Sequence, residues 1–229
     1  MNIPVVRKLL EKNAAAAQEN RAWFDRRSIT CVNLLGGPGS GKTTLLEHVL
    51  PRLAADARCA VLEGDLATTR DAERIAAIGV PAVQLVTDGG CHLTAEHVQR
   101  ALRELDAQPA DLVFIENVGN LVCPANFELG EHARVVALSV AEGDDKPAKY
   151  ALMFRRAQLV VLTKLDLLPL VRFDVKRVRD DLRRIQPDID VLETNLRLPQ
   201  SFDAVTHWLR RMHANRAPGA KSGSGAHLG

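Results

Sequence analysis

Residues 36–43 read Gly36-Gly37-Pro38-Gly39-Ser40-Gly41-Lys42-Thr43, which fits the pattern G-x-x-x-x-G-K-[ST] at every fixed position. An apolar run typical of a buried strand precedes this octapeptide at residues 29–35, and an amphipathic helical pattern follows it at residues 44–50. A strand, a glycine-rich loop and a helix in this order are the context of a phosphate-binding loop. The glycines let successive N–H groups turn toward one anion, and the helix N-terminus adds the positive end of its dipole.

The polar positions of this loop have predicted tasks. We expect Lys42 to reach the β- and γ-phosphates of a nucleoside triphosphate, and the Thr43 hydroxyl to bind Mg²⁺. The alternative is a glycine-rich connection that binds no ligand. The residues predicted to surround the phosphates are Gly37, Gly39, Ser40, Gly41, Lys42, Thr43 and Thr44.

Composition places this 229-residue chain among ordinary globular proteins, because 46% of its residues are apolar and 25% are charged. Its net charge of +2 gives no reason to expect nucleic acid or a membrane surface as a partner. We expect a cytoplasmic protein, since no apolar stretch approaches the length of a membrane span and the N-terminus lacks a signal-peptide core. Its four cysteines are then expected to be reduced, so metal binding or burial is favoured over disulfides.

Short runs of Val, Ile and Leu alternate with helical patterns along the chain. Runs without polar alternation indicate strands that are buried on both faces, and the intervening helices imply right-handed crossovers. We therefore predict an α/β fold with a mostly parallel, twisted sheet of about seven strands flanked by helices. The predicted strands are residues 29–35, 59–63, 82–86, 112–116, 135–140, 159–163 and 189–192.

Three parts of the chain are predicted. Residues 1–28 are expected to form an N-terminal helix packed on the domain, because residues 5–27 are rich in helix formers. Residues 29–213 are predicted to be a P-loop GTPase domain that includes a metal site. Residues 214–229 carry no apolar pattern and are predicted to be a disordered tail.

Two acidic residues close predicted strands at the edge where parallel sheets bind ligands. Asp65 is expected to hold Mg²⁺ directly or through water, or to orient the attacking water; a plain helix cap is the alternative. Glu116, followed three residues later by Gly119, suits a γ-phosphate sensor in which the acid lies near Mg²⁺ and the glycine N–H reaches the phosphate. The candidate catalytic residues are Lys42, Asp65 and Glu116. Whether Asp65 or the substrate itself activates the water stays open.

The tetrapeptide Thr163-Lys164-Leu165-Asp166 fits [NT]-K-x-D after another predicted strand. The Asp166 carboxylate is expected to accept hydrogen bonds from N1–H and the 2-amino group of guanine, while the Lys164 stem lies over the base. Adenine lacks both donors and would leave the carboxylate unpaired. Thr163, Lys164 and Asp166 therefore predict that GTP and GDP, rather than ATP, are the nucleotides.

Cysteine and histidine form a second constellation. Cys91 and His92 follow a glycine pair after a strand, and Cys123 lies beyond the predicted γ-phosphate sensor. Two thiolates and an imidazole suit Zn²⁺ or Ni²⁺ but leave a tetrahedral set incomplete, so we expect a site closed by a two-fold dimer. The alternative is that these are buried thiols, as we read Cys31 and Cys59. If residues 116–119 move on hydrolysis, Cys123 moves with them, and nucleotide state is coupled to metal affinity.

These motifs together resemble the HypB family, the GTPases that assist nickel insertion during [NiFe]-hydrogenase maturation. The resemblance covers roughly residues 13–186, and its most specific stretch separates this chain from the related urease accessory GTPases. The segments that carry it, besides the phosphate-binding loop, are Gly90-Cys91-His92-Leu93, Ile115-Glu116-Asn117-Val118-Gly119-Asn120-Leu121-Val122-Cys123-Pro124 and Glu142-Gly143-Asp144-Asp145-Lys146-Pro147.

The resemblance implies a P-loop GTPase of the SIMIBI class that forms a nucleotide-dependent homodimer and uses GTP with Mg²⁺. It implies Ni²⁺ or Zn²⁺ at Cys91, His92 and Cys123, and a contribution of Lys146 across the dimer. It also implies two kinds of partner, a HypA-type nickel chaperone and the machinery that matures the hydrogenase large subunit.

The chain departs from the family in three places. It has neither the cysteine-rich N-terminal motif nor the histidine-rich stretch found in some members, so nickel storage is not expected. Thr94 stands where an acid is usual. Residues 192–198 replace the usual Ser-Ala start of the last base-contacting loop, so a weaker nucleotide affinity is expected.

Slow turnover is expected, because no residue resembles a supplied arginine finger or a catalytic glutamine. Two other functions remain as alternatives. One is a P-loop kinase or ATP-dependent transferase, which would need an acceptor pocket and an arginine-rich lid. The other is a passive zinc-stabilised protein that binds nucleotide without turnover.

Overall fold

A seven-stranded parallel sheet forms the centre of the computed structural model, which describes residues 4–65, 70–87, 90–105 and 109–216, with the backbone alone at residues 4–6, 65 and 86. The strand order is β3-β2-β4-β1-β5-β6-β7, and every neighbouring pair is parallel. The predicted α/β sheet is thereby confirmed. The strands are β1 (Thr30–Gly36), β2 (Cys59–Asp65), β3 (Ala82–Val86), β4 (Leu112–Glu116), β5 (Ala133–Ser139), β6 (Leu159–Thr163) and β7 (Asp190–Glu193).

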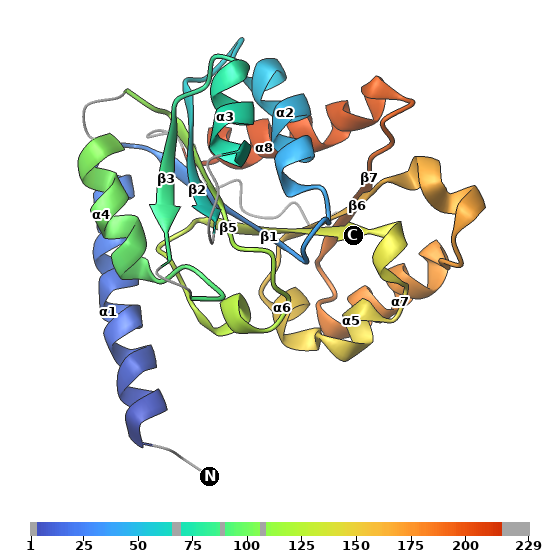
Figure 1. Ribbon diagram of the computed structural model, residues 1–229, viewed down its shortest axis with the longest axis horizontal. Coiled ribbons are helices and arrows are strands. Elements are labelled where there is room, and N and C mark those ends of the chain that lie inside the picture. The colour runs from blue at the N-terminus through green and yellow to red at the C-terminus, as the bar shows by residue number, and fades with distance from the viewer. Residues whose placement is uncertain (1–3, 66–69, 88–89, 106–108, 217–229) are drawn as a thin grey trace, which may run out of the picture.

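Helices cover both faces of this sheet (Figure 1). Within the described residues, none of them is both long and apolar enough to cross a membrane. The α-helices are α1 (Pro4–Arg26), α2 (Lys42–Leu53), α3 (Arg70–Ala77), α4 (Ala95–Leu105), α5 (Lys146–Lys149), α6 (Ala151–Arg155), α7 (Val175–Ile185) and α8 (Asp203–Ala214); the 3₁₀ turns are η1 (Cys123–Asn126), η2 (Val140–Glu142), η3 (Leu165–Leu170) and η4 (Pro199–Phe202).

The core lies on the two faces of the sheet, because the central strands are buried along their whole length. Helices α2, α3 and α8 pack on one face, where Leu50 of α2 and Leu209 of α8 join one apolar cluster with β1. On the other face α1 and α4 cover β2 and β4, while α6 and α7 cover β5 and β6 (Figure 1). Trp23 of α1 and Trp208 of α8 therefore lie against opposite faces of the sheet.

The long helix α1 is docked on the domain from Asn13 onward. Phe24 is fully buried, and Ala16 and Ala17 pack against Ala95 at the start of α4. At the other end of the chain, α8 continues to Ala214, and residues 217–229, most of the predicted tail, lie outside the described residues. The predicted division of the chain into three parts stays a prediction.

Candidate nucleotide and metal sites

The glycine-rich loop connects β1 to α2 at the edge of the sheet where the strands end. Gly39 and Gly41 have φ angles of 69° and 89°, which bend the loop back so that α2 begins directly after it. Lys42 and Thr43 form the first turn of α2 and are both buried beneath the loop. The geometry is that of a phosphate-binding loop at a helix N-terminus.

Three carboxyl groups meet beside this loop. Glu63, Asp71 and Glu116 each offer an oxygen within 4.8 Å of the others. Glu63 on β2 lies opposite Glu116 on β4 in the sheet register, and Thr43 Oγ1 donates to Glu116 Oε1 at 2.8 Å. Each glutamate also keeps one buried oxygen, Oε2, without a hydrogen-bond partner. Orphaned carboxylate oxygens beside a threonine hydroxyl fit a hard cation such as Mg²⁺.

Burial controls the protonation of this carboxylate cluster. It raises the pKa of Glu63 to about 10, and the adjacent Glu116 charge adds to the rise. Burial also raises the pKa of Glu116, although Lys42 and the Thr43 hydroxyl oppose the shift. Two carboxyl groups this close do not both ionise in a buried site without a compensating cation. A divalent cation would supply that compensation.

Glu63 and Asp71 are absent from the residues predicted from the sequence. Glu63 becomes visible only when the strand order places β2 beside β4, and Asp71 lies in the first turn of α3. Arg74 fixes Asp71 with an ion pair of 2.9 Å and also bonds Thr44 of α2. Asp65 ends β2, but its side chain lies outside the described residues, so its magnesium role stays a prediction.

The predicted guanine loop contacts the phosphate-binding loop directly. Thr163 Oγ1 donates to the Ser40 carbonyl at 2.6 Å, and Lys164 Nζ donates to the Gly39 carbonyl at 2.6 Å. On the other side, the Leu196 N–H donates to Asp166 Oδ1 at 3.4 Å. The segment that departs from the family pattern therefore still reaches the predicted base-reading carboxylate.

The predicted γ-phosphate segment runs alongside the phosphate-binding loop. The Asn117 N–H donates to the Leu34 carbonyl and the Asn120 N–H to the Gly36 carbonyl, both at 2.9 Å. Between them, Gly119 packs so closely that a Cβ atom on it would lie 2.9 Å from the Pro38 Cα. Gly119 therefore lies directly against the phosphate-binding loop, and its role as a γ-phosphate sensor stays a prediction.

The cysteine–histidine constellation is also assembled by the fold. One ligand atom from each of Cys91, His92 and Cys123 lies within 4.8 Å of the others, and Cys91 Sγ is 3.6 Å from His92 Nδ1. Loops carry all three residues: Cys91 and His92 lie between β3 and α4, and Cys123 begins η1 after β4. By contrast, Cys31 and Cys59 are buried within β1 and β2, and burial raises the pKa of Cys59 to about 12.

The donor set of this metal cluster fits a borderline metal such as Ni²⁺ or Zn²⁺. Burial lowers the pKa of His92, so its imidazole is neutral and can ligate. The pKa of Cys91 is raised, chiefly by its hydrogen bond with the Cys123 side chain. His92 Nε2 is buried without a hydrogen-bond partner, and the ring packs on Phe127 with centroids 4.0 Å apart.

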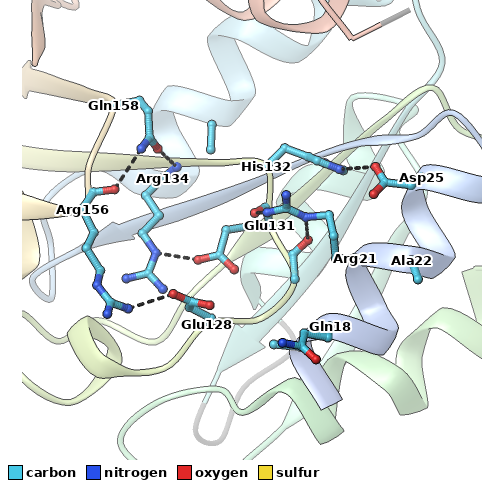
Figure 2. A pocket seen from close by; sticks show the side chains of 13 residues that line it. Gln18, Arg21, Ala22, Asp25, Glu128, Glu131, His132, Arg134, Arg156 and Gln158 are labelled. Atoms are coloured by element: carbon cyan, nitrogen blue, oxygen red, sulfur yellow. Dashed lines mark hydrogen bonds and ion pairs between the residues drawn. The ribbon is translucent and has the colours of Figure 1, made fainter. Parts of the chain in front are cut away.

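A separate hollow of about 650 Å³ lies between α1 and residues 128–134 (Figure 2). Polar side chains that line it bond one another or nearby carbonyls. Arg134 bonds Glu131 at 2.6 Å, while His132 and Asp25 are joined at 3.0 Å. Because this hollow leads to the first residues of β5 rather than to the ends of the strands, it does not belong to the nucleotide site.

Comparison with known proteins agrees with this geometry. The CobW/HypB/UreG nucleotide-binding domain family matches residues 30–193. A hydrogenase maturation factor HypB from Azotobacter chroococcum mcd 1 is 47% identical over 214 residues, covering 93% of this chain and 70% of the relative. This chain belongs to the HypB family. It is therefore a P-loop GTPase.

Two solved HypB structures share the fold. The Archaeoglobus fulgidus HypB crystal structure has a TM-score of 0.83 at 35% identity, covering 89% of this chain and 99% of that one. The Helicobacter pylori HypB structure, in complex with nickel, has a TM-score of 0.86 at 35% identity, covering 92% and 99%. The predicted fold of the SIMIBI class is confirmed in this HypB-family chain.

Proposed function

We propose that this chain is a GTP-hydrolysing nickel chaperone that assists nickel insertion during [NiFe]-hydrogenase maturation. The observation that carries the proposal is the convergence of Cys91, His92 and Cys123 within 4.8 Å, at the same sheet edge as the phosphate-binding loop. Curated relatives named hydrogenase maturation factors and the nickel complex of the Helicobacter pylori protein support it. Free thiols as ligands fit a reducing compartment, the cytoplasm.

Phosphate binding and hydrolysis are assigned to the buried side of the site. Mg²⁺ would be held by Thr43 with Glu116 and its neighbours Glu63 and Asp71, and it would neutralise charge on the phosphates. Lys42 binds the β- and γ-phosphates. The Gly119 N–H senses the γ-phosphate.

Guanine is assigned to the loop after β6, with Asp166 reading the base edge and Lys164 lying over the ring. The surroundings of the phosphate-binding loop support slow turnover. Arg74, which reaches the carboxylate cluster from α3, is already engaged by Glu47 at 2.6 Å and by Asp71 at 2.9 Å. We therefore propose that hydrolysis acts as a timer for a switch.

We propose that two chains close the metal site in a GTP-dependent homodimer. The cluster offers two thiolates per chain, and Cys91 is exposed at the surface. Val122, beside Cys123, is 59% exposed although it is apolar. Lys146 lies close by, lining a hollow with Pro38 and Tyr150. A second copy placed over this edge would cover Val122 and bring four thiolates together.

Asn120 gives the proposed coupling of nucleotide and metal a physical path. Its backbone N–H bonds the Gly36 carbonyl of the phosphate-binding loop. Its side chain donates to the Cys91 carbonyl and accepts from the Cys123 N–H, each at 3.3 Å. A shift of residues 116–119 on phosphate release would therefore change the separation of Cys91 and Cys123. We infer that this change in the separation of the two cysteines releases nickel to a HypA-type partner and the large-subunit maturation machinery.

The test is to titrate Ni²⁺ and Zn²⁺ into the purified protein in nucleotide-free, GDP-bound and GTP-analogue-bound forms. Cys91→Ala and Cys123→Ala should abolish tight binding, and Cys59→Ala, a buried thiol outside the cluster, is the matched control. Affinity or stoichiometry should differ between nucleotide states. Metal binding that ignores both nucleotide and the cluster cysteines would overturn the proposal.

A further inference from the structure

Asn13 of α1 bonds both loops that carry the metal cluster. Its Nδ2 donates to the Glu128 carbonyl at 2.8 Å, and its Oδ1 accepts from the Ala95 N–H at 2.9 Å. Ala95 lies three residues after His92, and Glu128 lies five residues after Cys123. One carboxamide therefore joins the two ligand-bearing segments at their far ends.

Asn20 repeats this arrangement two helical turns further along the same face of α1. Its Nδ2 donates to the Ala95 carbonyl and to the Leu129 carbonyl, both at 2.9 Å. Asn20 is only 1% exposed. If its amide is lost, water cannot replace it as the hydrogen-bond donor to the Ala95 and Leu129 carbonyls. Asn13 and Asn20, the two clamp asparagines, thus bond both the backbone N–H and the backbone C=O of Ala95.

The clamp reaches the metal cluster along two short paths. Along one, Ala95 begins α4 and anchors the segment that presents His92. Along the other, the carbonyls of Glu128 and Leu129 fix the chain directly after Phe127, whose ring packs on His92 with centroids 4.0 Å apart. Both paths are short, three residues of chain from Ala95 to His92 and one ring contact from Phe127 to His92, so a change in α1 docking alters where the imidazole lies relative to Cys123.

We propose that Asn13 and Asn20 are positioning residues for the metal site, which hold the Cys91–His92 loop and the Cys123 loop at the separation that ligation requires. This inference rests on the proposed metal site. By thermodynamic reciprocity, metal bound at the cluster stabilises the docking of α1.

The surroundings of the clamp supply matched variants. Within the described part of the chain, the Arg21 side chain donates hydrogen bonds to the Gly130 and Glu131 carbonyls, on the segment after Cys123 (Figure 2). Gln99 of α4 donates to the Ala16 carbonyl and to Glu19, both on α1. Arg21→Ala and Gln99→Ala therefore each weaken α1 docking on one side without removing a link between the two loops.

The experiment titrates Co²⁺ alone into the full chain and follows the thiolate-to-cobalt absorption bands, which report both affinity and ligand geometry. Asn20→Ala should weaken Co²⁺ binding about tenfold and alter the bands, because second-shell partners hold ligands in place. Asn13→Asp keeps the acceptor for Ala95 but loses the donor to Glu128, and it should have the same effect. Arg21→Ala and Gln99→Ala should stay within about twofold of the parent protein, and GTP affinity should be unchanged in all four.

A second readout tests reciprocity, through amide hydrogen exchange of α1 with and without Co²⁺. Metal should slow exchange in α1 of the parent protein, and this protection should vanish in Cys123→Ala. If Asn20→Ala does not fold, Asn13→Asp carries the test by itself, because it leaves the buried Asn20 and its bonds to Ala95 and Leu129 in place.

The proposed metal site and the clamp are refuted by different results. If Cys123→Ala still binds Co²⁺ like the parent, the proposed metal site is wrong and the inference falls with it. If Cys123→Ala loses the metal while Asn20→Ala and Asn13→Asp retain parent affinity and bands, the clamp alone is refuted. Equal losses in the single-sided controls would also refute it, since general loosening of α1 would then explain the effect.

Discussion

Two three-residue clusters lie at the same edge of the sheet and differ in almost every property. Glu63, Asp71 and Glu116 are carried mainly by strands and offer hard oxygen atoms from a largely buried site. Cys91, His92 and Cys123 are carried by loops and offer soft sulfur and imidazole at the surface. Both triplets bring their ligand atoms within 4.8 Å, so proximity alone does not distinguish them.

The difference indicates what each cluster is built to do. A buried oxygen cluster on rigid strands suits a cation that stays with the nucleotide during chemistry. A partly exposed thiol cluster on loops suits a metal that must arrive and leave. The proposed catalytic cation and the proposed cargo would thus be separated by ligand hardness, by burial and by the stiffness of the supporting elements.

The largest expected effect comes from breaking the oxygen cluster. Glu116→Gln keeps the shape of the side chain but removes the charge that faces Thr43, so GTP hydrolysis should fall about 100-fold or more. Steady-state phosphate release at saturating Mg²⁺ measures it, with Glu128→Gln, an exposed carboxylate outside the nucleotide site, as the control. Nickel affinity measured on the same sample should change less than about twofold. Parent-like hydrolysis would remove Glu116 from the proposed magnesium site.

Breaking the thiol cluster should have the opposite effect, so that metal binding is lost while GTP hydrolysis is retained. Cys123→Ser replaces a soft ligand with a hard, protonated hydroxyl, so Ni²⁺ affinity should fall on the order of 100-fold. Equilibrium titration against a colorimetric chelator measures it. Metal-free GTP hydrolysis should remain within about twofold. A matching loss of hydrolysis would show that the two clusters work as one site and do not have separate tasks.

A third variant separates recognition of the base from binding of the phosphates. Asp166→Asn replaces an acceptor with a donor, which opposes the 2-amino group of guanine but suits the 2-carbonyl of xanthine. GTP affinity should fall roughly 10- to 100-fold, and xanthosine triphosphate should gain affinity. Competition against a fluorescent nucleotide measures both. If GTP and ATP then bind as they do to the parent, Asp166 does not read the base.

The last prediction concerns stability rather than activity, namely the pH dependence of folding in the magnesium-free protein. The pKa of Glu63 is about 10 when folded, against 4.5 for a free carboxyl, so the folded state holds a proton that the unfolded state releases. Stability should therefore fall as pH rises between those values.

Glu63→Gln should flatten this slope, as measured by urea unfolding in EDTA between about pH 6 and pH 9. The exposed Glu128→Gln is the control and should retain the parent slope. A parent-like slope in Glu63→Gln would show that Glu63 does not carry the extra proton.

Local pattern was enough to predict the strands, because fully buried parallel strands need uninterrupted apolar runs. It also predicted that Cys91 and Cys123 would meet, since both follow strands that end at one edge. Glu63 and Asp71 could not be found in this way. Their convergence with Glu116 depends on β2 lying beside β4 and on the register of α3, and strand order is a property of the whole chain rather than of any segment.

The position of α1 on the domain could not be predicted from local sequence pattern either. Helix formers in residues 5–27 predict a helix, but nothing in them says that Asn13 and Asn20 will face Ala95. In a helix, asparagine is a weak former that is normally solvated or at a cap. Two buried asparagines seven residues apart on one helix are the signal that this face bonds backbone elsewhere.

The placement of the two tryptophans makes the molecule its own optical probe. Trp23 lies on α1 with the Arg27 guanidinium 4.2 Å above its ring, and Trp208 lies across the sheet with its indole N–H bonded to Asp190 at 2.6 Å. Since these are the chain's only tryptophans, Trp208→Phe leaves a single fluorophore on α1. Its emission then reports, in real time and without a label, when the helix loosens or tightens on the domain.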